Sequence, residues 1–210
     1  MPWIKKTPLY MLLLGLLFSS PIVNANIPED KRQDVDAFIN TMVTQHQFNR
    51  TELNTLFEHV NLNQSIVDAM NKPHEKLPWY KYRTLFVTDE HVKGGLAFWN
   101  QHEAALKRAE KQYGVPAEII TAIIGVETRY GKMTGKYPVI DALSTLAFNY
   151  PPRAGFFRKE LSEYLLLTRE EHIDPLSLKG SYAGAMGHPQ FMPSSYRNFA
   201  IDFDHDGNRD

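Results

Sequence analysis

The spacing of apolar residues most constrains the fold of this 210-residue chain. Beyond the first 25 residues, apolar side chains recur three and four positions apart, which is the period of an α-helix with one buried face. No alternating run is long enough to predict a strand, apart from a short ribbon around 132–140. The sequence therefore predicts a mainly α fold, with helices in the following segments: 34–45, 51–60, 89–112, 116–128, 141–148 and 156–168.

The first 25 residues have the layout of a secretory signal peptide. Lys5 and Lys6 give a positive start, residues 9–18 form an apolar core, and the tripeptide 23–25 (VNA) ends in small residues that signal peptidase accepts. The apolar core is too short to span a bilayer comfortably, and an uncleaved anchor is the alternative interpretation. We expect cleavage after Ala25, which would leave a soluble periplasmic chain with no stable membrane anchor.

Composition excludes several classes of function. The chain has no cysteine, so no disulfide and no lipid on a signal-peptide cysteine can hold it. Lys and Arg total 23 against 24 for Asp and Glu, which leaves no basic surface for nucleic acid or for an anionic membrane. The eight histidines show no spacing typical of a zinc site, so zinc catalysis has no support.

The segment 116–128 carries the strongest sign of chemistry. It is apolar almost all round, which predicts a central core helix. One carboxylate, Glu127, shares a face with three apolar residues: Ile120, Ile123 and Ile124. Those neighbours and the nearby helix C-terminus would both raise its pKa, as a general acid for a glycosidic oxygen requires. From spacing alone, the alternative is a buried glutamate paired with a neighbouring cation: Arg129, Lys132 or Arg153.

Three motifs, in order, resemble those of lytic murein transglycosylases of the B type: 126–131 (VETRYG), 148–151 (FNYP) and 180–195 (GSYAGAMGHPQFMPSS). The resemblance runs from about Trp79 to the last residue. It implies a lysozyme-like helical catalytic domain over residues 79–210, preceded by a small N-terminal helical lobe over residues 26–78. The substrate it implies is the peptidoglycan glycan strand, and we expect the protein to act as a monomer.

The resemblance also implies a reaction. Glu127 would protonate the oxygen between N-acetylmuramic acid and N-acetylglucosamine, and would then act as base on the muramoyl 6-hydroxyl, which forms a 1,6-anhydro end. A muramidase that uses water is the first alternative. It would need a second carboxylate about 5–9.5 Å away, for which Asp141 is a candidate. A catalytically silent peptidoglycan-binding protein is the second alternative.

Further positions match the family's substrate contacts. Four match residues that line the sugar cleft or hydrogen-bond an N-acetyl group: Tyr82, Ser181, Gln190 and Phe191. Arg153 matches one of two adjacent arginines that meet the glycan or its peptide, but Pro152 replaces the other. Without the resemblance, Tyr82 and Phe191 fit core packing equally well, and Ser181 fits a turn hydroxyl.

Residues 202–210 (DFDHDGNRD) resemble the start of an EF-hand calcium loop. The carboxylates at positions 1, 3 and 5 are Asp202, Asp204 and Asp206. Gly207 permits the sharp turn at position 6, Asn208 would offer its carbonyl at position 7, and Asp210 lies near position 9. The family carries a calcium loop here, but the sequence stops before the acid that normally completes it. We therefore expect a structural calcium site that is weak and incomplete, and a domain that is C-terminally incomplete relative to the family. An acidic surface turn is the alternative.

Overall fold

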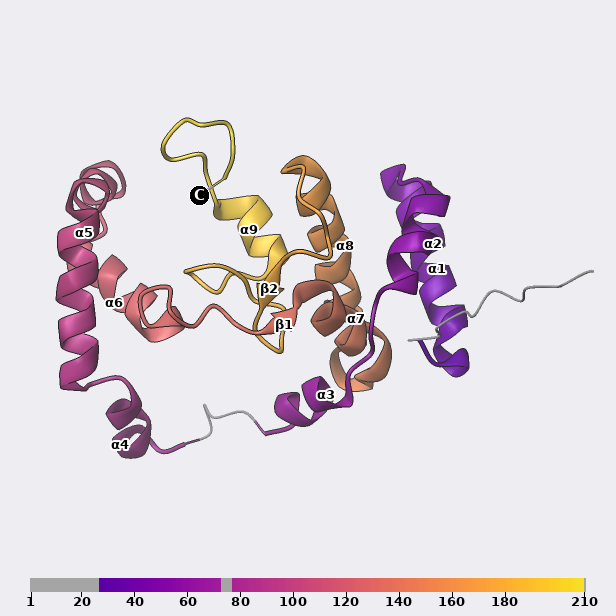
Figure 1. The fold of residues 1–210 in the computed structure, drawn as a ribbon, viewed down its shortest axis with the longest axis horizontal. Coiled ribbons are helices and arrows are strands. Elements are labelled where there is room, and N and C mark those ends of the chain that lie inside the picture. Colours follow the sequence, from indigo (N-terminus) through magenta and orange to yellow (C-terminus); the bar gives the residue numbers. More distant parts are fainter. Residues whose placement is uncertain (1–26, 73–76, 210) are drawn as a thin grey trace, which may run out of the picture.

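The computed structural model describes residues 27–72 and 77–209, and it confirms a mainly helical chain (Figure 1). The predicted signal peptide and Asp210 lie outside the described residues. The helices are α1 (Glu29–His46), α2 (Arg50–Glu58), α3 (Gln64–Met70), α4 (Trp79–Tyr82), α5 (Asp89–Tyr113), α6 (Ala117–Thr128), α7 (Val139–Asn149), α8 (Ala154–Glu170) and α9 (Pro193–Phe199). Short 3₁₀ turns follow α4 (Arg83–Leu85) and α7 (Pro151–Arg153).

One strand of the ribbon predicted around 132–140 is present, but its partner lies outside that range, and the two form the one sheet among the described residues. Strand β1 (Tyr137–Pro138) runs antiparallel to β2 (Lys179–Gly180), with Tyr137 opposite Gly180 and Pro138 opposite Lys179. This pairing joins two segments that are about forty residues apart in the sequence.

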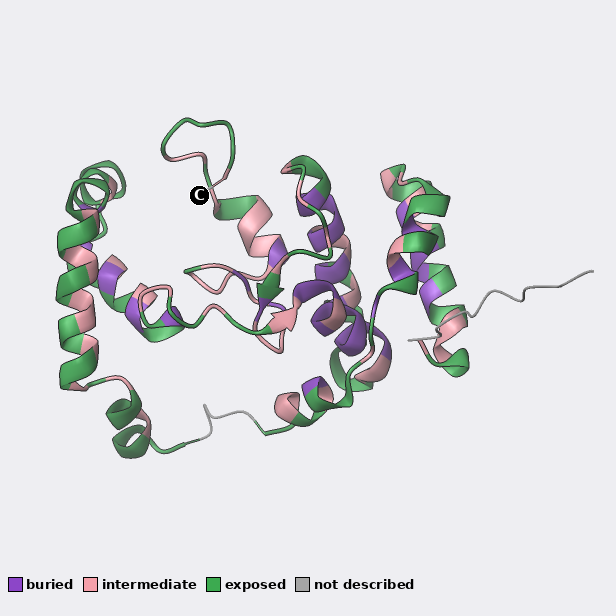
Figure 2. Cartoon of the chain, in the orientation of Figure 1, coloured by how far each residue is buried: buried purple, intermediate pink, exposed green. Residues whose placement is uncertain are grey.

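The main hydrophobic core surrounds α7, which is buried along nearly its whole length (Figure 2). Apolar residues on every face of α7 explain this position, because such a helix is stabilised when other elements cover it on all sides. Helix α8 packs on one side of α7, and the N-terminal helices α1–α3 pack on another. Phe38 of α1 meets Phe57 and Phe148 edge to face, with ring centroids 6.0 Å apart in each pair. Residues of α1–α3 therefore share one core with α7 and α8, while a domain boundary near residue 78 stays a prediction.

Helices α5 and α6 pack against each other and lie apart from α7 and α8 (Figure 1). The prediction that 116–128 is a central core helix is wrong. Its buried residues are small or hydroxylated: Ala117, Thr121, Gly125 and Thr128. Ile119 and Ile123 are each 51% exposed. Small side chains let the two helix backbones approach closely, so this face makes the contact and the isoleucine face is left outside.

Helix α5 continues through Gly94 and Gly95, and its non-helical dihedrals lie at His102 (φ −114°, ψ 18°). Of its apolar residues, Leu106 is buried, whereas Leu96 is 61% exposed. No helix in the described ranges combines the length and apolar character needed to cross a membrane.

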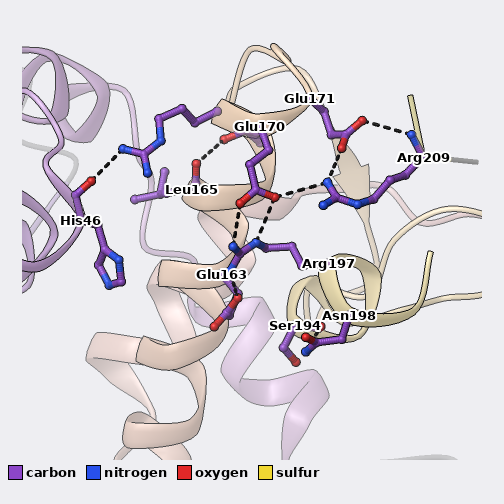
Figure 3. Close-up of polar contacts among 11 residues, drawn as sticks. His46, Glu163, Leu165, Glu170, Glu171, Ser194, Arg197, Asn198 and Arg209 are labelled. Atoms are coloured by element: carbon purple, nitrogen blue, oxygen red, sulfur yellow. Dashed lines mark hydrogen bonds and ion pairs between the residues drawn. The ribbon is translucent and has the colours of Figure 1, made fainter. Parts of the chain in front are cut away.

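Polar contacts hold α9 and the C-terminal loop onto α8 (Figure 3). Arg197 of α9 pairs with Glu163 and, at 2.6 Å, with Glu170. Arg209 pairs with Glu171 and, at 3.2 Å, with Glu170. Glutamates of α8 and its C-cap therefore hold both α9 and the end of the loop 202–209, called the acidic loop below.

Candidate active site

Glu127 lies one residue before the end of α6. The helix ends because Arg129 and Tyr130 both adopt left-handed backbone dihedrals (φ 48° and 61°), followed by Gly131 (φ 83°). The amide of Arg129 donates to the Gly125 carbonyl (3.0 Å), which is the bond of a left-handed helix C-cap, and the amide of Tyr130 donates to the Ile124 carbonyl (3.3 Å). The chain therefore turns away sharply just after Glu127, and its side chain stands at the helix terminus.

The Glu127 carboxyl is exposed but incompletely solvated. Partial burial raises its pKa above the ordinary value of 4.5. In the part of the chain that the structure describes, its side chain makes no hydrogen bond or ion pair, so the alternative of a glutamate paired with Arg129, Lys132 or Arg153 is wrong. The raised pKa has the direction expected of a general acid, although its cause is partial desolvation at a helix end and not enclosure in a core.

The end of α6 meets the segment 180–195 (GSYAGAMGHPQFMPSS), called the signature segment below. The Thr128 hydroxyl donates to the carbonyl of His188 (3.2 Å), and a side chain on Gly131 would collide with the His188 ring. Further along, Gly135 lies against the backbone of Gly180, where an added Cβ would come within 2.0 Å of the carbonyl. The residues after Glu127 and the signature segment therefore lie side by side, although some fifty residues separate them in sequence.

Ser181 shapes a tight turn inside the signature segment. Its hydroxyl oxygen accepts the amides of Ala183 (3.3 Å) and Ala185 (3.1 Å), and its own amide donates to the Ala185 carbonyl (2.9 Å). The side chain is partly exposed. The turn-hydroxyl interpretation therefore holds in this structure, and it is compatible with donation of the hydroxyl proton to a ligand.

Gln190 and Phe191 form the other side of this segment. Gln190 takes a left-handed backbone conformation (φ 50°). Its side-chain amide nitrogen (Nε2) donates to the backbone carbonyls of Thr134 and Gly187, each at 3.1 Å. Phe191 exchanges backbone hydrogen bonds with Met186 (2.9 and 3.1 Å), and its ring is partly exposed. Gln190 therefore ties the signature segment to the loop that follows Glu127.

Tyr82 and Arg153 belong to other parts of the molecule. Tyr82 ends α4 in an aromatic cluster, with its ring centroid 5.1 Å from that of Phe86 and 6.4 Å from that of Trp79. Arg153 is exposed and lies over the Phe156 ring at 4.3 Å. No hydrogen bond or ion pair among the described residues joins either side chain to Glu127.

Asp141 occupies the first turn of α7, and its carboxylate accepts the amide of Asn61 at 2.9 Å. Burial raises its pKa, and the hydrogen bonds from Asn61 oppose that rise. The side chain therefore faces the connection between α2 and α3 and serves to join that segment to α7.

The acidic loop has a donor set suited to a hard cation. Asp202, Asp204 and Asp206 each offer one carboxylate oxygen, and the three oxygens lie within 4.8 Å of one another. Calcium binds oxygens at 2.3–2.6 Å, so two ligands on opposite sides of one ion stand about 5 Å apart, and this cluster fits. Asp202 also accepts the amides of Asp206 and Gly207, each at 3.0 Å, and Gly207 has the positive φ (96°) expected at position 6.

Three residues of this region carried no prediction: Thr128, Tyr130 and His188. Thr128 and His188 make the contact between α6 and the signature segment, which depends on tertiary structure. Tyr130 packs against glycines of α5 and α6. The adjacent glycines at 94 and 95, unusual inside a helix, are the sequence signal that could have indicated a close contact there.

Comparison with known proteins agrees with the resemblance of the motifs. A family model described as a transglycosylase SLT domain matches residues 30–210. Membrane-bound lytic murein transglycosylase B of Escherichia coli (strain K12) is 48% identical over 180 residues, which make up 81% of this chain and 50% of that protein. This chain therefore spans about half the length of that relative.

Solved structures show the same fold. Soluble lytic transglycosylase SltB1 from Pseudomonas aeruginosa matches with 57% identity and a TM-score of 0.81, over 83% of this chain and 59% of that chain. Escherichia coli Slt35, solved in complex with calcium, matches with 48% identity and a TM-score of 0.80, over 84% of this chain and 57% of that chain. The mainly helical prediction is confirmed, and the fold is that of solved lytic transglycosylases.

Proposed function

This chain belongs to the family of transglycosylase SLT domains, and we propose that it acts as a peptidoglycan lytic transglycosylase in the periplasm. Its substrate would be the β-1,4 bond between N-acetylmuramic acid and N-acetylglucosamine, and its product a 1,6-anhydromuramoyl end. The relatives' names supply the reaction class and the substrate, since they are described as lytic and murein transglycosylases.

Glu127 would carry both proton transfers. In its acid form it protonates the bridging oxygen as the bond from that oxygen to C1 of the muramoyl residue breaks. The resulting carboxylate then takes the proton of the muramoyl 6-hydroxyl as O6 bonds to C1, which restores the acid. Because the substrate supplies the nucleophile, this scheme needs only one carboxyl. The observation that carries the proposal is a carboxyl of raised pKa at the end of α6, beside the signature segment.

Five other side chains would bind the glycan: Tyr82, Arg153, Ser181, Gln190 and Phe191. Ser181 suits this role because its hydroxyl oxygen accepts two backbone amides, which fixes the hydroxyl in place for donation to an N-acetyl carbonyl. Gln190 would act mainly by holding the segment 187–191 against the loop that follows α6. Arg153 would add a cationic and aromatic surface together with Phe156.

The decisive experiment digests purified peptidoglycan with the chain and with Glu127→Gln, and identifies the products by mass spectrometry. Loss of the acid should lower the rate of 1,6-anhydro product release by about 10²–10⁴-fold. Glu118→Gln is the matched control, because Glu118 is an exposed acid in the first turn of the same helix. It should leave the rate unchanged.

Other outcomes separate the alternatives. Products that carry only reducing ends would identify a muramidase and contradict the transglycosylase proposal. Asp141 was the candidate for the second carboxylate that a muramidase would need. Its carboxylate already accepts the backbone amide of Asn61, which argues against that alternative. Binding to insoluble peptidoglycan without any release, in both wild type and Glu127→Gln, would identify a silent binding protein.

We further propose that the acidic loop binds a structural calcium ion through Asp202, Asp204, Asp206 and the carbonyl of Asn208. When bound, the ion would neutralise three clustered carboxylates and hold the loop closed. The oxygen-only donor set and the positive φ of Gly207 support this assignment.

Calcium should raise the melting temperature, and magnesium should raise it less. At a calcium concentration a hundredfold above Kd, we expect a rise of about 5–10 °C, measured by circular dichroism. Asp204→Asn should lose most of that rise, whereas Asp36→Asn, which removes an exposed acid from α1, should keep it. Equal responses of the chain to calcium and magnesium would argue against the site.

A further inference from the structure

The position of the Glu127 carboxyl depends on the backbone at the end of α6. Since its side chain makes no hydrogen bond or ion pair among the described residues, no neighbouring group orients it directly. Its direction is therefore set by where α6 ends and how rigidly that end is held. Two residues close behind it, Thr128 and Tyr130, make the contacts that hold it.

Tyr130 occupies a notch between α5 and α6 whose walls are glycines. A Cβ on Gly94 would lie 2.9 Å from two ring carbons of Tyr130, and one on Gly95 would lie 2.8 Å from its hydroxyl oxygen. A Cβ on Gly125 of α6 would lie 2.6 Å from the same oxygen. Each distance is shorter than a normal contact, so a side chain at any of the three positions would displace the ring. By contrast, a Cβ on Gly155 of α8 would meet nothing within 4 Å.

A hydrogen bond fixes the ring in this notch. The Tyr130 hydroxyl donates to the carbonyl of His91 in α5 at 2.9 Å, and the ring centroid lies 5.7 Å from that of Phe98. Partial burial of the phenol raises its pKa, consistent with a ring held between the two helices. Glycines inside helices weaken them, and here the weakening is offset by the space they leave for this ring.

The two contacts hold the helix end from different directions. Tyr130 fastens it to α5, and the Thr128 hydroxyl fastens it to His188 in the signature segment, while accepting the amide of Gly131 at 3.0 Å. The left-handed dihedrals of Arg129 and Tyr130 are unfavourable for residues with a Cβ, so tertiary contacts must maintain them. Insertion of the ring into the notch provides such a contact.

We propose that Tyr130 is a positioning residue for Glu127: by filling the glycine notch, its ring holds the end of α6 so that the carboxyl stays in reach of the glycan. This inference rests on the proposed transglycosylase function. It assigns no contact with substrate to Tyr130, which acts through the backbone of residues 127–130.

Three variants test the proposal from both sides of the notch. Tyr130→Ala empties it, Gly94→Ala displaces the ring from the opposite helix without altering α6, and Tyr130→Phe keeps the ring but removes the bond to His91. We expect the first two to lower kcat on peptidoglycan by about 10- to 100-fold with a much smaller change in KM, because misplacement by about 1 Å is enough for such a loss. Tyr130→Phe should retain most of kcat.

Two controls match the changes in chemistry. Tyr113→Ala truncates an exposed tyrosine at the far end of α5, and Gly155→Ala adds a methyl group where space is open. Both should leave kcat and KM unchanged. If Tyr130→Ala fails to fold, Gly94→Ala and Tyr130→Phe still test whether the seated ring controls the carboxyl.

A second readout needs no turnover. Carbon-detected NMR titration of the Glu127 carboxyl should show its pKa falling toward that of an exposed glutamate in Tyr130→Ala and Gly94→Ala, and staying raised in Tyr130→Phe. An inactive wild type would contradict the proposed function, while the titration would still decide on positioning. An active wild type whose kcat and Glu127 pKa are unaltered by Gly94→Ala and Tyr130→Ala would overturn the positioning role and leave the function standing.

Discussion

At the scale of single residues, the proposed chemistry depends on a carboxyl that is accessible and yet poorly solvated. Glu127 is exposed, as a group proposed to act on a polymer must be, but the surrounding helix end removes enough water to raise its pKa. No neighbouring cation opposes that rise among the described residues. Accessibility and a retained proton therefore coexist at one side chain.

The raised pKa should be visible in the stability of the chain. The folded state holds the Glu127 proton more tightly than the unfolded chain does, so this group favours the fold at pH values below its unfolded-state pKa. That contribution is lost as the pH rises from about 4.5 through the folded-state value. Urea unfolding at a series of pH values should show this loss in wild type and not in Glu127→Gln. Identical pH dependence in both proteins would contradict the raised pKa.

At the scale of elements, α9 depends on α8 for its position. A helix of seven residues is not stable in isolation, so tertiary contacts must hold it. Glu160 of α8 is 2% exposed, and its carboxylate accepts both the amide (2.9 Å) and the hydroxyl (2.7 Å) of Ser194 in the first turn of α9. A buried carboxylate at this helix N-terminus therefore joins the signature segment to the main core.

Replacement of that carboxylate should cost more stability than replacement of a more exposed one on the same helix. We expect Glu160→Gln to lower the free energy of unfolding by about 1.5–3 kcal/mol, because a buried charge-assisted hydrogen bond is lost. Glu163→Gln removes one partly exposed ion pair with Arg197 and should cost no more than about 1 kcal/mol. Urea unfolding measures the loss of stability in each variant. A larger loss in Glu163→Gln than in Glu160→Gln would show that the contact of Glu160 with Ser194 does not stabilise the packing of α9 on α8.

At the scale of the whole molecule, the two parts of the chain differ in how much apolar surface they bury (Figure 2). The core around α7 is tightly enclosed, whereas α5 and α6 leave large apolar side chains exposed: Val92, Leu96, Ile119, Ile123 and Val126. Within α5, Leu106 is the one buried residue. The helix that carries Glu127 therefore belongs to the less enclosed part of the described chain.

This difference predicts unequal local stability. Amide hydrogens in the middle of α5 and α6 should exchange with deuterium faster than those in the middle of α7 and α8. Local opening of α5 and α6 breaks fewer buried contacts and therefore costs less free energy. Hydrogen exchange followed by mass spectrometry measures both regions in one experiment. Equal protection of the two regions would contradict the predicted difference.

Features that depend on residues close together in the chain could be predicted before the fold was known. Helical periods located the ends of the longer helices to within five residues, and the spacing of Asp202, Asp204 and Asp206 predicted a cluster that the structure forms. The shorter helices α3, α4 and α9 were missed, since four to seven residues are too few to display a helical period. Glu127 was selected by the motif around it, and its pKa shift has the predicted direction.

Which helix faces contact each other could not be predicted from these patterns. The many apolar residues of 116–128 predicted a buried isoleucine face. Two helices pack best where small side chains let their backbones come close, so the face with Gly125 and Thr121 packs on α5. The contact of Thr128 with His188 and the entry of Tyr130 between Gly94 and Gly125 join segments far apart in sequence. No periodicity records such a contact, because its free energy depends on the shape of both partners once they are folded together.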